Sequence, residues 1–397
     1  MYCALQRTNQ RDRLGSGHVD ANMDPSKLGG KYTLIIPTHN RPDNFAQLLD
    51  YFEVNSVEFR IIILDSSDEN GVTANSRKVG SFSLNAEHFS YDPGIPVNDK
   101  LMDGISKVET EYFSICADDD LVFLPAIAES VGYLERNLEY LTAHGYYLSF
   151  STEENDVAIR AVTYGTPSID SPDPLHRLYD FIRYYQPTFY GVHRTEAMKK
   201  NFANINRVRG FLFEEIIHAG LTVINGKVAR IRRFYYGRRA ENNFADPENP
   251  KNETGHPLKW FMRDPENLLG EFVKYRDVII EALQNTGKIS MNTDELRQYL
   301  DLLHGGYLAS SLDHERIYAK AREKIGIDKP ENSKNASDDT TSANWRGLSV
   351  KVNSGARQTR TYQLYRTFLS HLNVSPPASP LFNNEDVFDM IKSFDTF

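Results

Sequence analysis

The sequence predicts an α/β fold built on a mostly parallel sheet, and two observations carry that prediction. Within residues 31–117, short apolar and β-branched runs alternate with segments of helical spacing, which is the pattern of βαβ units in a parallel sheet. The runs show no polar alternation, so we expect strands that are buried on both faces. A third observation is that from about residue 257 onward the strands end and helical spacing takes over, so the sequence adds a helical C-terminal appendage to the α/β fold.

The elements of the first part follow from this alternation. Apolar residues of the first helix recur three and four positions apart, as on one helical face: Phe45, Leu48, Leu49 and Phe52. The remaining runs are assigned in the same way. We expect strands at 32–36, 59–64, 87–91 and 112–117, and helices around 45–52 and 97–108.

After residue 125 the pattern is mixed. Aromatic and β-branched runs indicate paired strands, and a basic, aromatic stretch follows at 229–239. The expected strands are 140–151, 157–164, 188–192 and 221–224, and the expected helices are 125–137, 175–185, 211–220, 268–283, 293–303, 312–325 and 361–372. We expect residues 1–30 to be disordered, 31–255 to form the α/β domain, and 256–397 to form a helical region with a mobile loop at 328–345.

Charge and cysteine content limit the function classes. The chain has 45 Lys and Arg against 54 Asp and Glu, a net charge of -9, which argues against a nucleic-acid partner. Cys3 and Cys116 are too far apart for a zinc motif, so we expect a reducing cytoplasm. No apolar run is long enough for a transmembrane segment, and a peripheral membrane contact stays open.

Three aspartates stand between two apolar runs in the stretch SICADDDLVF, at 114–123. Adjacent like charges repel, and burial beside apolar residues disfavours each ionised form further. A divalent cation such as Mg²⁺ or Mn²⁺ would compensate, since these ions prefer carboxylate oxygens. An acidic turn or a helix start would also account for the triplet. The residues alone leave both roles open.

Polar residues also follow the other predicted strands at their carboxyl ends, where ligands of open α/β sheets bind. They are Thr38, His39, Asn40 and Arg41 after the first strand, and Asp65, Ser66 and Ser67 after the second. We expect these loops to converge on a pocket with the Asp triplet at its centre. Asn40 and Arg41 could equally form a turn before Pro42.

Four pieces, in this order and spacing, resemble the family 2 glycosyltransferases with their GT-A fold. They are IIPTHNRP at 35–42, IIILDSS at 61–67, the Asp triplet in the place of the family's Asp-x-Asp motif, and FEE at 213–215. The run TFYGVHRTE at 188–196 is similar to a loosely characterised bacterial branch of transferases. The resemblance covers about 32–239. It implies a donor half at 31–125 and an acceptor half at 126–255.

The resemblance implies a metal-dependent, inverting transfer of a sugar from a nucleoside-diphosphate sugar, with a UDP-sugar favoured. The acceptor would be a glycan or a lipid-linked hydroxyl compound in polysaccharide or glycoconjugate synthesis. Mn²⁺ or Mg²⁺ would be held by Asp120 with Asp118, and Asp118 would also contact the ribose. Asp119 is counted with the donor site, although we expect it to point away or cap the next helix. Glu215 would be the base and Glu214 its alternative; both could instead simply favour a helix start.

Further site residues are proposed from their residue types and their places in the chain. Lys100 and the pair Arg238 and Arg239 would reach the diphosphate oxygens. Tyr190 and His193 would line the acceptor side, although a single His there is more often a structural group. The other donor-binding residues are Pro37, Thr38, Asn40, Arg41, Asp65 and Ser67. Many family members have a second acid after Asp65, where this chain has Ser66. The identity of the donor's nucleotide base therefore stays open.

Two other functions fit parts of the sequence. A nucleotidyltransferase that forms nucleotide sugars also needs an α/β sheet, acids and magnesium, but it should have a Gly-rich phosphate loop, and PTHNRP has none. A non-catalytic GT-A binding or scaffold module is disfavoured by the intact carboxylates. In every case we expect the C-terminal helices to mediate acceptor docking or self-association as a homo-oligomer.

Overall fold

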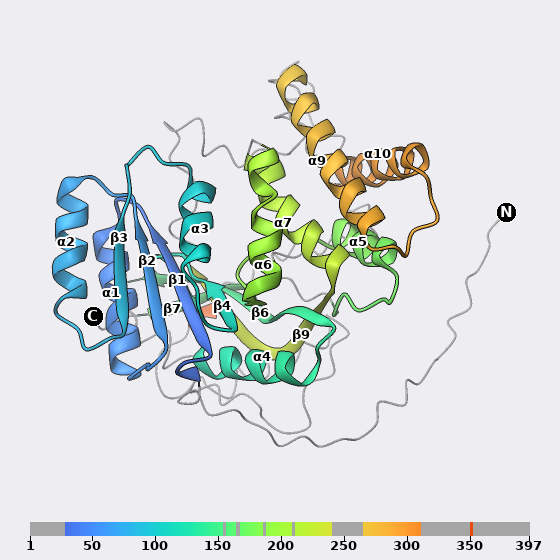
Figure 1. Ribbon diagram of the computed structural model, residues 1–397. Coiled ribbons are helices and arrows are strands. Elements are labelled where there is room, and N and C mark those ends of the chain that lie inside the picture. The colour runs from blue at the N-terminus through green and yellow to red at the C-terminus, as the bar shows by residue number, and fades with distance from the viewer. Residues whose placement is uncertain are drawn as a thin grey trace, which may run out of the picture.

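The computed structural model describes residues 28–153, 156–163, 167–185, 188–208, 211–239, 265–310 and 350–351. This part of the chain confirms the α/β class: a ten-stranded sheet is flanked by helices (Figure 1). The sheet order is β10-β7-β6-β8-β4-β1-β2-β3, and β5 and β9 pair beside this path. The expectations for residues 1–27, for the loop 328–345 and for helices at 312–325 and 361–372 lie outside the described residues.

The first half is a parallel sheet in which β4, β1, β2 and β3 are neighbours. Its elements are β1 (Tyr32–Thr38), α1 (Pro42–Val54), β2 (Arg60–Asp65), α2 (Glu69–Val79), β3 (Ala86–Ser90), α3 (Val97–Ser106) and β4 (Tyr112–Ile115). Thr38 is in register with Asp65, so β1 and β2 end side by side. The loops expected to form a pocket therefore leave the sheet at one edge.

The second half mixes parallel and antiparallel pairs. Its elements are β5 (Leu121–Val122), α4 (Leu124–Arg136), β6 (Tyr140–Glu153), β7 (Asp156–Thr163), α5 (Pro174–Arg183), β8 (Val192–Arg194), α6 (Thr195–Phe202), the 3₁₀ turn η2 (Ile205–Arg207), α7 (Phe211–Asn225), β9 (Lys227–Arg239), α9 (Pro265–Asn285), α10 (Thr293–Ser310) and β10 (Val350–Lys351). Strand β9 runs parallel to β6 and antiparallel to β5. This pairing brings the end of β9 to the Asp triplet.

Strand alternation divides the core into two clusters on opposite faces of the sheet. Leu34 and Ile36 of β1 pack with α1 and α4, whereas Ile35 packs with α3 and α7. Helices α9 and α10 join the second cluster, which contains fully buried Tyr275 and Leu300. In Figure 1 these two helices lie beside α5 and α7. Much of their apolar surface is thus buried within the chain.

Four details differ from the expected elements. The strand expected at 221–224 is wrong, because α7 continues to Asn225; a fully buried helix end with β-branched residues lacks helical periodicity. Residues 188–191 form a turn, and β8 begins only at Val192. The sequence does not predict helix α2, which buries only Gly71 and Asn75 and so shows no apolar stripe. Helix α6 is likewise an addition to the expected elements.

Candidate functional site

The Asp triplet lies where β1 and β4 end, and its side chains meet the loop after β1. Thr38 Oγ1 donates to Asp118 Oδ2 at 2.7 Å, and Arg41 Nη1 donates to Asp118 Oδ1 at 3.2 Å and to Asp119 Oδ2 at 2.6 Å. Asp118 and Asp120 are only 3% and 5% exposed. Arg41 therefore supplies part of the positive charge that was expected to compensate the Asp triplet. The expectation that Asp119 caps the next helix is wrong, since no side chain caps α4.

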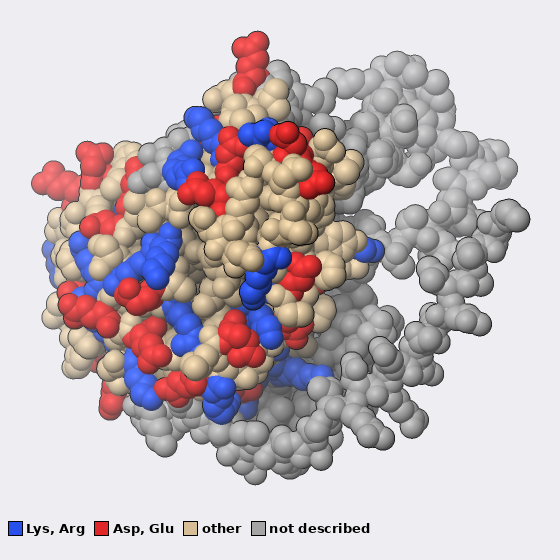
Figure 2. Space-filling view, turned by 45° about the vertical axis from the view of Figure 1, so that its right-hand side comes forward, with Lys and Arg blue, Asp and Glu red and all other residues tan. Residues whose placement is uncertain are grey.

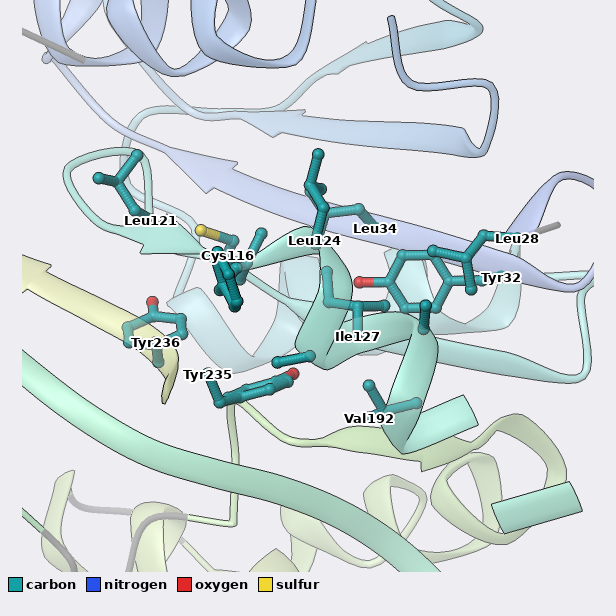
Figure 3. Close-up of a cluster of buried hydrophobic side chains, with 14 of the residues drawn as sticks. Leu28, Tyr32, Leu34, Cys116, Leu121, Leu124, Ile127, Val192, Tyr235 and Tyr236 are labelled. Atoms are coloured by element: carbon teal, nitrogen blue, oxygen red, sulfur yellow. The ribbon is translucent and has the colours of Figure 1, made fainter. Parts of the chain in front are cut away.

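The turn that carries the triplet is hydrogen-bonded to two residues of β9. Asp120 Oδ1 accepts from the backbone N–H of Arg239 at 3.0 Å. The buried Tyr236 hydroxyl accepts from the N–H of Ala117 at 3.1 Å. Tyr236 and Cys116 belong to the buried cluster shown in Figure 3. The triplet is thus placed by aromatic core packing and not by a flexible loop.

Burial changes the proton affinity of two of these acids. It raises the pKa of Asp118 to about 6; Arg41 and Thr38 oppose the shift and the charge of Asp119 adds to it. Burial, with the charge of Asp119, also raises the pKa of Asp120 above its usual range. Removing these carboxylates from water disfavours their charged forms. A cationic ligand here would relieve that penalty.

The same side chains form a donor set for a divalent ion. Across the described ranges, no group of three or more His, Cys, Asp or Glu side chains forms a ready-made metal site. Mg²⁺, however, is usually bound through one or two carboxylates, with waters and substrate phosphates completing its shell. Asp118 and Asp120, two buried carboxylates two positions apart, fit such an ion. Asp118 would exchange its contact with Arg41 for the metal.

Lys100 supplies a buried positive charge beneath the same loops. Its Nζ donates to Thr38 O at 2.8 Å and to Ser66 Oγ at 2.7 Å, and the residue is 3% exposed. Burial lowers its pKa to about 8, although Asp118 and Asp65 favour the charged form. The ammonium therefore remains mostly protonated at pH 7. Its position suits an anionic ligand at this edge.

Asp65 is fully buried, and both of its carboxylate oxygens are bonded to other groups of the protein. Ser67 N donates to Oδ1 at 2.8 Å, and Asn75 Nδ2 and His88 Nε2 lie 2.9 Å from Oδ2. Burial opposes ionisation, but these hydrogen bonds hold the pKa of Asp65 below its usual range. Asp65 thus orders the loop after β2. The structure places it below the loop surface.

The loops after β1 and β2 are cross-linked. Asn40 N donates to Ser67 Oγ, and Asn40 Oδ1 accepts from Asp68 N, both at 2.9 Å. Asn40 has a φ of 53°, a conformation that Asn tolerates better than most residues. Pro37 lies within β1, opposite Leu64. The turn-forming role considered for Asn40 is therefore present in the structure.

Helix α7 brings Glu214 toward α3. Asn98 Nδ2 donates to Glu214 Oε2 at 2.6 Å, and Asn98 lies two positions before Lys100 on α3. The first turn of α7 is thereby tied to the helix that carries the buried lysine. The side chain of Glu215 lies outside the described part of the chain.

The two residues expected on the acceptor side have different surroundings. His193 is 1% exposed; its Nδ1 lies 2.8 Å from Thr142 Oγ1 and its Nε2 2.9 Å from Phe189 O. Burial lowers its pKa to about 4, so it is a neutral group of the core. Tyr190 is partly exposed, and its ring centroid lies 4.6 Å from that of Tyr236.

The arginines of β9 lie at the same edge. The Arg239 guanidinium lies over the Phe150 ring at 5.7 Å, and its Nη2 is 3.5 Å from Gln47 Oε1. The positive charge of Arg238 opposes the rise in the pKa of Asp120. On the face drawn in Figure 2, positive and negative side chains are mixed, with no extended field of one sign. The positive groups at the triplet are therefore local.

Sequence reasoning missed two supports of the site, Tyr236 as the anchor of the triplet turn and Asn98 as the partner of Glu214. Their partners are 119 and 116 positions away, and no local pattern reports such a pair. Ser66 had a signal, since it follows a predicted strand, but its bond to Lys100 depends on the fold. Of the described side chains, the structure gathers Thr38, Arg41, Lys100 and the Asp triplet, and it adds the backbone N–H of Arg239. It leaves Asp65 and His193 in the core.

Comparisons with known proteins give weak likenesses. No protein-family model matches the chain, and no curated protein matches it. The chain is similar to S. aureus TarS 1–349, with 14% identity over 73% of this chain and 82% of that one, at a TM-score of 0.39. TarS 1–349 in complex with UDP-GlcNAc is 12% identical over 68% of this chain and 70% of that one, at a TM-score of 0.44. The 4-diphosphocytidyl-2C-methyl-D-erythritol synthase of Anaerococcus prevotii is 10% identical over 52% of this chain and 88% of that one, at a TM-score of 0.34. The functional argument therefore rests on the site.

Proposed function

We propose that this protein is a metal-dependent, inverting glycosyltransferase that uses a nucleoside-diphosphate sugar, with a UDP-sugar as the favoured donor. The observation that carries the proposal is the meeting of two buried carboxylates, Asp118 and Asp120, with two cations where strands β1 and β4 end. Arg41 donates to Asp118, and Lys100 donates to Thr38, whose hydroxyl itself donates to Asp118. Buried acids and bases of opposite charge at one sheet edge are typical of functional sites. The resemblance of the sequence pieces to family 2 glycosyltransferases supports the same function.

In this proposal Asp118 and Asp120 hold Mg²⁺ or Mn²⁺, which when bound neutralises negative charge on the leaving diphosphate. Arg41, which bonds to Asp118 and Asp119 in the structure, would then be available to contact the donor. Lys100 contributes its ammonium charge beneath the loops after β1 and β2, and Arg238 and Arg239 lie at the end of β9. Arg groups bind phosphate oxygens through two parallel hydrogen bonds.

The acceptor hydroxyl needs a base on the opposite side of the sugar in an inverting displacement. We assign this role to Glu215, with Glu214 as the alternative, on the resemblance of the FEE piece at 213–215. Glu214 lies in the first turn of α7, and Glu215 follows it directly. Asn98 fixes one carboxylate oxygen of Glu214, which orients that acid relative to α3. A general base contributes about two to four orders of magnitude to such a proton transfer.

The acceptor is proposed to be a glycan or a lipid-linked hydroxyl compound, with Tyr190 on that side. None of the described helices is long and apolar enough to cross a membrane. Cys116 is a free, buried thiol, which fits a reducing compartment. The cytoplasm is therefore the proposed location.

A donor screen tests the proposal. Purified protein is incubated with UDP-, GDP-, CDP- and TDP-sugars, in EDTA and in Mn²⁺, and nucleoside diphosphate release is measured. Release that requires Mn²⁺ is the expected result. Release of pyrophosphate from a nucleoside triphosphate and a sugar phosphate, with no hydrolysis of any donor, would assign the protein to the nucleotidyltransferases instead.

A further inference from the structure

An apolar cavity of about 330 Å³ lies between α7, α9 and α10. Its walls include Phe213 and Ile216 from α7, Phe272 and Val273 from α9, and Gly305 from α10. Its volume reaches the lower range of small-molecule sites, which are mostly apolar and concave. The cavity is separate from the Asp triplet, and nothing in the proposed donor chemistry uses it.

The charged residues of the cavity wall form an ion pair, and His304 is hydrogen-bonded on both ring nitrogens. Arg276 Nη1 donates to both oxygens of Asp301, at 2.8 and 2.9 Å. His304 Nδ1 lies 2.8 Å from Leu300 O, and its Nε2 lies 3.1 Å from Tyr275 OH. The charge of Arg276 in the cavity wall is therefore balanced by that of Asp301. An occupant without charge, held by apolar contact, suits it best.

The cavity wall continues into the proposed catalytic turn. Phe213 lines the cavity and Glu214 follows it directly in α7. Glu214 is bonded to Asn98 of α3, and Lys100 of that helix contacts the loop after β1. A molecule in the cavity would thus lie beside the turn of α7 that carries Glu214. That is the place where an acceptor hydroxyl is needed.

We infer that this cavity binds the hydrocarbon part of a neutral, amphipathic acceptor whose hydroxyl end is glycosylated. The inference rests on the proposed glycosyltransferase function and names its acceptor class: a hydroxyl compound with an alkyl or isoprenoid-like chain. The concave shape and small volume favour a chain of this kind over the flat face of a second protein copy.

Two neighbouring glycines of α10 allow a matched test. A Cβ added to Gly305 or to Gly306 would meet no atom within 4 Å, and both substitutions improve helix propensity. Only Gly305 lines the cavity. Gly305→Leu should therefore fill the cavity without disturbing the core, whereas Gly306→Leu places the same side chain on the same helix outside it. Melting temperatures of both variants at or above that of the unchanged protein establish that they fold.

The probes are n-alkyl β-D-glucosides from butyl to decyl, kept below their aggregation concentrations and titrated calorimetrically in the presence of UDP and Mn²⁺. In the unchanged protein and in Gly306→Leu, affinity should rise about fourfold per added methylene, with an increasingly negative heat-capacity change. In Gly305→Leu the affinity should not depend on chain length. A flat series in the unchanged protein, or equal slopes in the two glycine variants, would overturn the inference.

Two further measurements complete the test. The first distinguishes a hydrocarbon site from a dimer interface, and the second tests the proposed activity independently of the cavity. A dimer seen by light scattering in the unchanged protein and in Gly306→Leu, but lost in Gly305→Leu, would assign the cavity to a second copy and overturn the inference. Donor hydrolysis is measured in the same three proteins. Its absence from all three, with the chain-length dependence intact, would remove the glycosyltransferase function while leaving the cavity as a hydrocarbon site.

Discussion

The backbone N–H of Arg239 donates a hydrogen bond of 3.0 Å to Oδ1 of Asp120, which lies 119 positions earlier in the chain. This contact joins the last residue of β9 to the triplet that follows β4. It opposes the effect of burial on the pKa of Asp120, because a donor to the carboxylate favours its charged form. The proposed donor half and acceptor half are thus connected at the proposed metal ligand itself.

The first prediction concerns Asp120→Asn. Asn retains an oxygen for the Arg239 N–H but removes the charge, so UDP affinity in Mn²⁺ should fall at least about tenfold, or ~1.4 kcal/mol, while the melting temperature is kept. Calorimetry of UDP binding in EDTA and in Mn²⁺ measures the metal-dependent part of the affinity. Asp119→Asn is the control and should have a smaller effect, because Asp119 pairs with Arg41. Equal affinity of the unchanged protein in the two buffers would contradict the metal assignment.

Sequence patterns located the strand ends, because apolar runs and the polar residues that follow them are adjacent in the chain. They could not show which of those residues face a ligand. Asp65 ends a buried strand and Asp118 follows another. Asp65 is nevertheless enclosed by Asn75 and His88, which come from later elements. The same limit accounts for α2, whose polar surface hides its period, and for the end of α7, whose complete burial removes it.

The second prediction is that Asp65 stabilises the fold and contributes little to donor binding. Asp65→Asn leaves buried donors without a charged acceptor, so the free energy of unfolding should fall by about 2–4 kcal/mol. UDP affinity of the folded variant should stay within about threefold. Urea unfolding and calorimetry measure the two effects. Because the pKa of Asp65 is lowered in the fold, its contribution should be complete above about pH 4 and disappear on further acidification. Normal stability with lost UDP affinity would instead make Asp65 a donor ligand.

The third prediction concerns Lys100, whose pKa burial lowers to about 8. A bound diphosphate favours the ammonium, so the pKa should be higher in the complex than in the free protein. Below pH 8 both states carry the proton and UDP affinity should not change on this account. Above pH 8 the free protein loses the proton first, and affinity should fall by up to about tenfold per pH unit. Lys100→Met should bind more weakly at pH 7 and lack this dependence. A parallel decline in Lys100→Met would exclude Lys100 as its cause.

The fourth prediction is that the C-terminal helices are part of the core. On α10, Leu300 is fully buried and Leu302 is 77% exposed, which provides a matched pair. Leu300→Ala should lower the free energy of unfolding by about 2–5 kcal/mol, and Leu302→Ala by at most about 0.5 kcal/mol. Urea unfolding followed by circular dichroism measures both. Equal effects would mean that α10 does not pack on α5 and α9 as in the structure.

Truncation at residue 264 extends this prediction. Removing α9 would expose the apolar surface of α7 that it covers, including fully buried Ile217. We expect the truncated chain to aggregate or to melt without cooperativity. A soluble truncated chain with an unchanged mass state and normal glycosylation would show that these helices serve neither the core nor acceptor docking.

The last prediction separates a catalytic base from a structural acid at Glu214 and Glu215. Gln keeps the shape of each side chain but accepts no proton at neutral pH. If Glu215 is the base, Glu215→Gln should reduce turnover by about two to four orders of magnitude and leave donor affinity and melting temperature nearly unchanged.

Glu214→Gln tests the alternative, because Glu214 Oε2 accepts from Asn98. If Glu214 only ties α7 to α3, Gln retains an acceptor oxygen, and turnover should fall by less than about tenfold, as should that of Asn98→Ala. If Glu214 is the base, Glu214→Gln should be folded and inactive, and Asn98→Ala should lower turnover by more than about tenfold, because the base would lose the hydrogen bond that orients it. Turnover, donor affinity and melting temperature are measured side by side for all three variants. Near-normal turnover in both Gln variants would leave the proposed transferase without its base and would favour the binding module.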